Sequence, residues 1–178
     1  KLYDVKNIDY TNYEEDIYVG YRDYATRKVE VAYPFGYGLT YSQFEMRDMK
    51  VEECKRGFKV SCVVKNVGNF PAKQVVQLYS TELAPEVDRP AIELRGYKKT
   101  PLLKAGEKCV VEIVIKKEDL MTYNEKASAW KLTKGDYELS LGFDSQTLPL
   151  KHKVTITKEV LRSVSTLMAP ANGEVFVR

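Results

Sequence analysis

Short apolar runs separated by polar turns follow one another along most of this 178-residue chain. Residues 57–68 and residues 137–143 alternate most regularly between apolar and polar side chains. A period of two is typical of a strand with one buried face. The side chains predicted to point inward are Phe58, Val60, Cys62 and Val64 in the first run and Tyr137, Leu139, Leu141 and Phe143 in the second. Glu138 and Ser140 are predicted to point outward.

Similar runs predict further strands and set the fold class. These runs cover residues 45–53, 74–80, 92–97, 109–115 and 148–157. Turns recur about every ten residues, so the pattern predicts an all-β, antiparallel, immunoglobulin-like sandwich. The antibody order of Cys, Trp and Cys is absent because Trp130 follows every cysteine. The fibronectin type III-like variant of the sandwich therefore fits better.

Three local features refine this prediction. Residues 109–115 are so rich in β-branched side chains that we expect burial on both faces for part of the run. Residues 118–123 predict a single helical turn, and residues 129–132 predict an edge strand or its remnant. Gly96 predicts a bend or bulge within its strand.

Residues 33–44 break the alternation with the sequence Tyr-Pro-Phe-Gly-Tyr-Gly-Leu-Thr-Tyr-Ser-Gln-Phe. Pro34 fixes its own φ, and Gly36 and Gly38 can adopt positive φ without a clash at Cβ. The aromatic and aliphatic side chains expose too much apolar surface for a solvated linker. We therefore expect an ordered strap that packs between two bodies.

The two ends of the chain lie outside the strand series. Residues 1–32 are rich in tyrosine, and residues 17–24 predict either a short strand or the lead into a helical turn. This segment cannot form a domain alone, because an isolated strand or hairpin is marginally stable in water. At the other end, Val160, Val164, Leu167 and Met168 have helical spacing, which predicts a possible short C-terminal helix.

Composition excludes several classes of protein. The chain is 44% apolar and 30% charged, as in ordinary globular domains, with a formal net charge of +3. Charges of both signs are mixed, so there is no basic stripe for nucleic acid. No apolar run reaches the roughly 18 residues of a membrane-spanning helix. The chain reads as a fragment of a longer polypeptide, and its compartment stays open, with the cytoplasm favoured over secretion.

Candidate chemistry is sparse. An odd number of cysteines, Cys54, Cys62 and Cys109, argues against a disulfide framework and favours free thiols. A bridge between Cys54 and Cys62 remains the alternative. His152 is the only histidine and no Cys-x-x-Cys spacing occurs, so we expect neither a metal nor a cofactor.

The strap sequence resembles the join before the fibronectin type III-like domain in family 3 glycoside hydrolases of the β-glucosidase type. Residues 15–22 are similar to the stretch that closes the α/β domain in that family. Asp16 replaces the usual glycine there, and Asp tolerates the left-handed region better than most residues. Further motifs follow in the family's order at residues 64–68, 76–79, 89–97, 103–107 and 135–137.

This resemblance implies a division of the chain. Residues 1–32 would end an α/β domain, residues 33–44 would be an interdomain strap, residues 45–157 would form the fibronectin type III-like sandwich, and residues 158–178 would be a tail or linker. The implied partners are the barrel and α/β domains of the same enzyme, in one polypeptide or a companion chain. Carbohydrate substrate would be reached only through that parent enzyme. The implied interface residues are Tyr18, Gly20, Tyr21, Arg22, Tyr33, Pro34, Phe35, Gly36, Tyr37 and Gly38.

The same resemblance implies a non-catalytic role. Glycoside hydrolysis needs two carboxyl groups on either side of the scissile bond. The family's nucleophilic Asp follows a Ser-Asp-Trp-like motif in the barrel, and its acid/base Glu lies elsewhere. Neither motif occurs in this chain, so we expect no catalytic residue and a domain that braces the catalytic domains of an enzyme hydrolysing terminal β-glycosidic bonds. The alternative is a free-standing carbohydrate-binding or adhesion module, because tyrosine suits both sugar stacking and domain interfaces.

Overall fold

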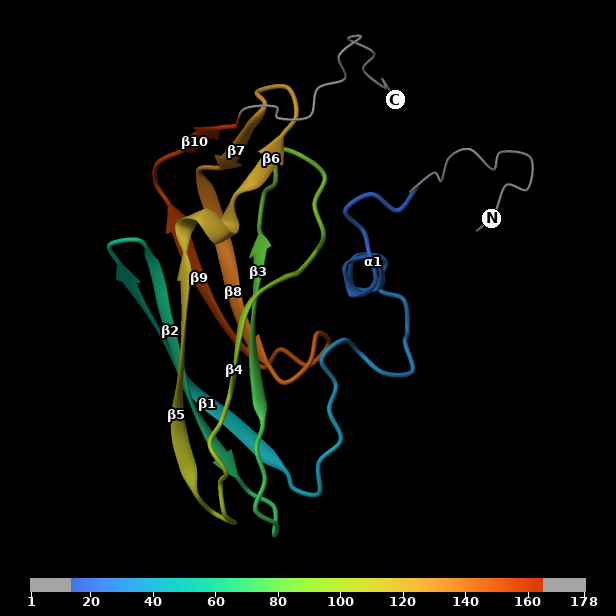
Figure 1. Ribbon diagram of the computed structural model, residues 1–178, viewed down its shortest axis with the longest axis vertical. Coiled ribbons are helices and arrows are strands. Elements are labelled where there is room, and N and C mark those ends of the chain that lie inside the picture. Colours follow the sequence, from blue (N-terminus) through green and yellow to red (C-terminus); the bar gives the residue numbers. More distant parts are fainter. Residues whose placement is uncertain (1–13, 165–178) are drawn as a thin grey trace, which may run out of the picture.

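Ten strands form three antiparallel sheets within residues 14–164, the part of the chain that the computed structural model describes (Figure 1). The strands are β1 (Phe44–Cys54), β2 (Gly57–Asn66), β3 (Val75–Glu82), β4 (Glu93–Lys99), β5 (Lys108–Lys116), β6 (Thr122–Asn124), β7 (Ala129–Leu132), β8 (Gly135–Gly142), β9 (Leu150–Ile156) and β10 (Val160–Ser163). Their orders are β1-β2-β5, β4-β3-β8-β9 and β10-β7-β6. The predicted all-β sandwich is confirmed.

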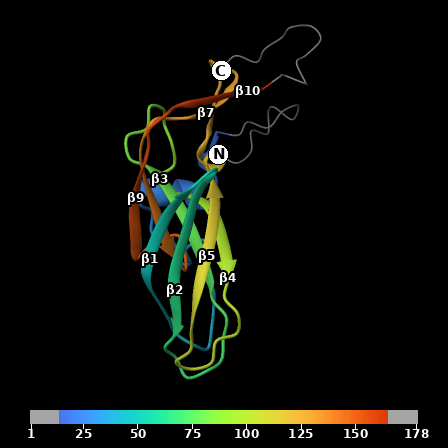
Figure 2. The same cartoon turned by 90° about the vertical axis from the view of Figure 1, so that its left-hand side faces the viewer.

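The core lies between the β1-β2-β5 sheet and the β4-β3-β8-β9 sheet, and Figure 2 shows β1, β2 and β5 side by side as one layer. The inward side chains predicted for β2 are all buried. Tyr137, Leu139 and Leu141 of β8 are buried as predicted, whereas Phe143, directly after β8, packs against the core and is only partly buried. Removing this apolar surface from water is the main favourable term in folding.

Gly96 marks the predicted irregularity in β4. The pairing of β4 with β3 shifts between Leu78 and Tyr79, so that Leu78 lies opposite Gly96 and Tyr79 lies opposite Leu94. Arg95 is the extra residue between the two partners, which is the arrangement of a β-bulge.

One burial prediction was wrong, and one residue that faces outward as predicted is nevertheless buried, because burial of the outer faces depends on the layers outside the core. β5 is buried on one face only, and Val110 and Val114 on its outer face are mostly exposed. Ser140 faces outward beside its register partner Tyr79, yet it is buried. The outer face of β3 and β8 is covered by residues 20–37, whereas no such layer covers β5 within the described residues.

The third sheet corrects two further predictions. Residues 129–132 are not an edge strand, since β7 lies between β6 and β10. The expected C-terminal helix is a strand where the structure describes it, because Val160–Ser163 pairs with β7 as β10. Pairing satisfies backbone groups that a single helical turn would leave open. Leu167 and Met168 lie outside the described residues. The single turn predicted over residues 118–123 is present only in part: the 3-10 helix η1 covers Lys117–Leu120, whereas Thr122 and Tyr123 belong to β6.

The N-terminal segment contributes the helix α1 (Tyr21–Arg27), which lies beside the sheet of β3 and β4 (Figure 1). Asp16 has a φ of 49°, so the turn expected at this position is retained. All three cysteines are free thiols, which excludes the bridge between Cys54 and Cys62. Burial raises the pKa of Cys62 to about 11. No helix in residues 14–164 has the length and apolarity that a membrane crossing requires.

Candidate docking interface

Tyr21 attaches the N-terminal segment to its own sandwich. Its ring stacks on Phe35 with centroids 4.6 Å apart and meets Tyr79 edge to face at 6.1 Å. Its hydroxyl accepts a hydrogen bond of 2.9 Å from the backbone N–H of Leu94. Tyr79 is fully buried beneath these contacts. The α1 segment is therefore packed on the outer face of β3 and β4.

Gln77 holds the middle of the strap. Its Nε2 donates to the carbonyl of Gly36 at 3.1 Å and to the carbonyl of Phe143 at 2.6 Å. Its Oε1 accepts from the Tyr79 hydroxyl at 2.6 Å. Gly36 has a φ of +81°, and a Cβ built there would collide with the Gln77 amide. Glycine is required at this position for both its backbone conformation and the close approach.

The end of the strap is fixed by a buried asparagine. Ser42 Oγ donates to Asn66 Oδ1 at 2.6 Å, and Asn66 Nδ2 donates to the carbonyls of Phe70 and Leu103, each at 2.8 Å. Asn66 is fully buried, so each bond satisfies a group that would otherwise be costly to leave unpaired. The strap backbone is thus anchored at both Gly36 and Ser42.

A cluster of charges lies under α1 and was not predicted. Arg89 forms ion pairs with Glu82 and, at 2.7 Å, with Glu93, which also pairs with Arg95 at 2.6 Å. Arg22 of α1 reaches Glu93 at 3.8 Å. The Arg89 and Glu82 side chains are almost completely buried. Alternation could not reveal this cluster, because its members come from α1, β3, β4 and the loop before β4.

Burial shifts the acid–base properties of two groups in this layer. Desolvation lowers the pKa of Arg95, and Glu93 offsets part of that effect. Burial, followed by a hydrogen bond to Asp88, raises the pKa of Tyr18 to about 12. Desolvation is the first cause of both shifts.

The outer edge of the strap faces solvent. Tyr33 is 71% exposed, Leu39 90% and Tyr41 96%, while Phe35 and Tyr37 are about half exposed. The rings of Tyr33 and Tyr37 lie 5.3 Å apart. We call these five side chains the strap surface. Contiguous exposed apolar side chains on an anchored backbone are typical of an interaction site.

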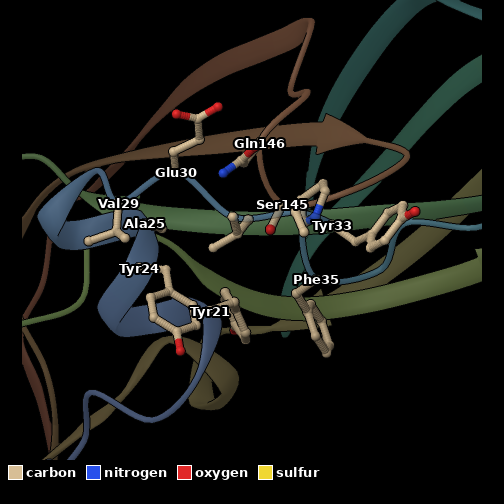
Figure 3. A pocket seen from close by; sticks show the side chains of 12 residues that line it. Tyr21, Tyr24, Ala25, Val29, Glu30, Tyr33, Phe35, Ser145 and Gln146 are labelled. Carbon is tan, nitrogen blue, oxygen red and sulfur yellow. The ribbon is translucent and has the colours of Figure 1, made fainter.

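A pocket of about 550 Å³ adjoins the strap surface. Figure 3 shows the rings of Tyr21, Tyr24 and Phe35 along one side and Glu30 on the opposite side. Ser145 and Gln146, from the loop after β8, complete the wall. Its lining is mainly apolar, so the pocket extends the same docking surface.

Seven of the ten predicted interface residues fall into two groups in the structure. Tyr21, Arg22 and Gly36 contact the chain's own sandwich, and Phe35 does so on one side while it remains half exposed on the other. Gly20 precedes α1 with a φ of 58°. The residues with the freest outward surface are Tyr33, Tyr37 and Gly38. Tyr18 and Pro34 are half-buried.

The chain is similar to known proteins of one family. Residues 74–145 match the family described as the fibronectin type III-like domain. Beta-glucosidase A of Butyrivibrio fibrisolvens is 36% identical over 92% of this chain and 23% of its own length. Thermostable beta-glucosidase B of Acetivibrio thermocellus is 35% identical over 85% of this chain and 20% of its own length.

Solved structures agree with the sequence comparison. Beta-glucosidase 3B from Thermotoga neapolitana, determined in complex with glucose, superposes with a TM-score of 0.82 at 37% identity, over 86% of this chain and 21% of that chain. The GH3 beta-glucosidase of Bifidobacterium adolescentis gives a TM-score of 0.76 at 31% identity, over 80% of this chain and 21% of that chain. The chain therefore spans about a fifth of the length of these relatives.

Proposed function

The chain belongs to the fibronectin type III-like domains of family 3 β-glucosidases, and from this membership we propose that it braces the catalytic domains of such an enzyme. The parent enzyme would hydrolyse terminal β-glycosidic bonds with carboxyl groups located in its other domains. The relatives are several times longer than this chain, which leaves room for those domains.

The observation that carries this proposal is the two-sided strap. One side is fixed to the sandwich through Gly36, Ser42 and the buried face of Phe35. The other side presents the strap surface, with Leu39 and Tyr41 almost wholly exposed. A solvated linker has no need of such anchoring, and a self-contained domain has no need of such exposure. Docking of a neighbouring body accounts for both.

The division of the chain follows from the same proposal. Residues 1–32 end the α/β domain, residues 33–44 are the strap, residues 45–157 are the sandwich and residues 158–178 are a tail or linker. The described part of the first segment contains one seven-residue helix, and none of its residues is buried. Such a helix needs a larger layer to cover its free side.

Three carboxylates of low exposure, Glu82, Glu93 and Asp144, support a non-catalytic role. A retaining glycosidase needs two carboxyl groups about 5–5.5 Å apart, and one must be free to act as nucleophile. Glu82 and Glu93 are instead neutralised by buried arginines. Asp144 Oδ1 accepts hydrogen bonds from the backbone N–H groups of Gln146 and Thr147, so this oxygen is committed to a turn.

The test uses the parent enzyme and the 178-residue chain side by side. Replacing Leu39 and Tyr41 with Ser should lower the melting temperature of the parent enzyme and leave that of the chain unchanged. The matched control replaces Val110 and Val114 with Ser. These residues are exposed on the bare face of β5, so the control should alter neither melting temperature. Equal effects of both double variants in the parent would contradict the bracing role. So would turnover of an aryl β-glucoside by the chain alone, if that turnover were lost on changing one of its carboxylates.

A further inference from the structure

An aromatic pair on the small end sheet has no role in the bracing proposal. Trp130 of β7 is the only tryptophan of the chain and is 44% exposed. Tyr123 of β6 is 42% exposed, and the two ring centroids are 5.6 Å apart at an interplanar angle of 68°. Figure 1 shows this sheet at one end of the sandwich, above η1.

Strand register brings a guanidinium group to the same face. Tyr123 pairs with Trp130, and Trp130 pairs with Arg162 of β10. Residues directly opposite each other in an antiparallel sheet point to the same side, with neighbouring strands about 4.8 Å apart. Arg162 makes no ion pair within the described part of the chain, so its N–H donors are available. We call these three side chains the end-sheet face.

The opposite face of the same sheet is different. Lys131, next to Trp130 in sequence, points the other way and pairs with Glu86 at 2.8 Å and Glu159 at 3.0 Å. Those two carboxylates raise its pKa. Charge on that face is therefore satisfied, whereas the end-sheet face keeps an unpaired cation beside two exposed rings.

The size of the end-sheet face limits what can bind. Three strands of three or four residues cover roughly 10 by 13 Å. A stable protein–protein interface needs about 800 Å² on each partner, several times this area. The two rings also stand nearly perpendicular, so they form a corner and not one long flat platform. Both features favour a small ligand with an apolar face and polar edges.

We propose that the end-sheet face binds one sugar unit of a neutral oligosaccharide. A pyranose ring has a C–H face that can stack on the indole of Trp130, and its hydroxyl groups can accept hydrogen bonds from Arg162. The Tyr123 hydroxyl can donate to or accept from a further sugar hydroxyl. Binding here would hold a glycan chain on the domain at a site separate from the strap surface, and it does not depend on the bracing role.

Trp130 makes the test specific, because any tryptophan emission from the 178-residue chain comes from this one site. Titration with cellohexaose, and separately with laminarihexaose, should give a saturable change in emission for at least one of the two. Arg162→Gln should weaken that binding about tenfold, since hydrogen bonds from a charged donor are worth more than neutral ones. Tyr123→Ser should also weaken it. Both variants keep the tryptophan as reporter.

The control is Tyr97→Ser, which removes another highly exposed tyrosine from β4 and should leave the affinity unchanged. Calorimetry on Trp130→Ala should show no binding, and its melting curve establishes whether it folds. If that variant does not fold, the affinity of Arg162→Gln for the hexasaccharide tests the proposal in its place. If neither hexasaccharide changes the tryptophan emission, the proposal is overturned. So does an affinity that Arg162→Gln and Tyr123→Ser leave as it was.

Discussion

The two outer faces of the sandwich are built from strands with the same alternating pattern, but one face is buried and the other is exposed. On the sheet of β3 and β8, the outward residues Gln77 and Tyr79 are buried beneath the strap and α1, and Ser140, the register partner of Tyr79, is also buried. On the sheet of β2 and β5, the outward residues Val110 and Val114 are largely exposed. Alternation decides which side chains face the core. It does not decide whether the other face is covered.

The two faces differ more in the burial of their polar and charged side chains than in their hydrophobicity. The covered face places charges in contact at low exposure, and each of its buried polar side chains has a partner, as in Gln77 and Glu93. The bare face carries Lys59 beside Glu52 and Glu112 in solvent. Buried groups that lose a partner are costly, while exposed pairs contribute little. The two faces should therefore respond very differently to mutation.

The largest effect should come from Glu93→Ala on the covered face. This change removes the carboxylate that pairs with Arg95 and leaves Arg89 with Glu82 as its remaining partner. Because the site is poorly solvated, the free energy of unfolding should fall by about 3–5 kcal/mol. Chemical denaturation of the chain measures the loss. Glu93→Gln is the matched control and should cost less, because it keeps the side-chain volume and an acceptor oxygen. A loss for Glu93→Ala as small as that of an exposed pair would show that the cluster is solvated.

Leu141→Ala, in the core between the two sheets, should lower the stability of the chain by a comparable amount. Leu141 is almost completely buried in β8, so truncation loses transfer free energy and leaves a cavity. The expected cost is about 2–5 kcal/mol. Thermal unfolding checks it, and a melting temperature close to that of the unchanged chain would mean that Leu141 does not face the core.

Gly36→Val should have a smaller effect on the sandwich and a larger one on docking. Positive φ and the close Gln77 amide both exclude a β-branched side chain, a strain of about 1–3 kcal/mol. Because the strap can detach from Gln77, the sandwich should remain folded. Comparing melting temperatures of the chain and the parent enzyme separates the two effects. Equal destabilisation in both would contradict this prediction.

Lys59→Ala on the bare face should have the smallest effect. Glu52 raises the pKa of Lys59 through a hydrogen bond and its charge, but both side chains lie at the surface, 38% and 61% exposed for Lys59 and Glu52. Salt screens such pairs, and holding two long side chains together costs entropy. We expect a melting temperature within experimental error of the unchanged chain at physiological salt. A clear drop would mean that this face also supports the fold.

The sequence predicted what depends on local pattern. The period of two in β2 and β8 located Val60, Leu139 and Leu141 in the core. Of the two strap glycines expected to allow positive φ, Gly36 adopts it and Gly38 does not. The resemblance to family 3 enzymes was confirmed by the comparisons.

What the sequence could not reveal depends on partners far along the chain. The exposure of Val110 and the burial of Ser140, which faces outward as predicted, were missed because neither residue encodes which face receives the strap. Residues 160–163 have helical spacing in isolation, but pairing with β7 makes them a strand. The cluster of Arg22, Arg89 and Glu93 joins segments separated by loops, so no short motif contains it.

The most direct test of the account compares side-chain accessibility in the chain and in the parent enzyme. Oxidative footprinting should modify Leu39 and Tyr41 readily in the 178-residue chain and much less in the parent, where the catalytic domains would cover them. Tyr97 and Val114, exposed outside the strap surface, should be modified equally in both. Equal modification of Tyr41 in the two proteins would contradict the claim that the strap surface docks another domain.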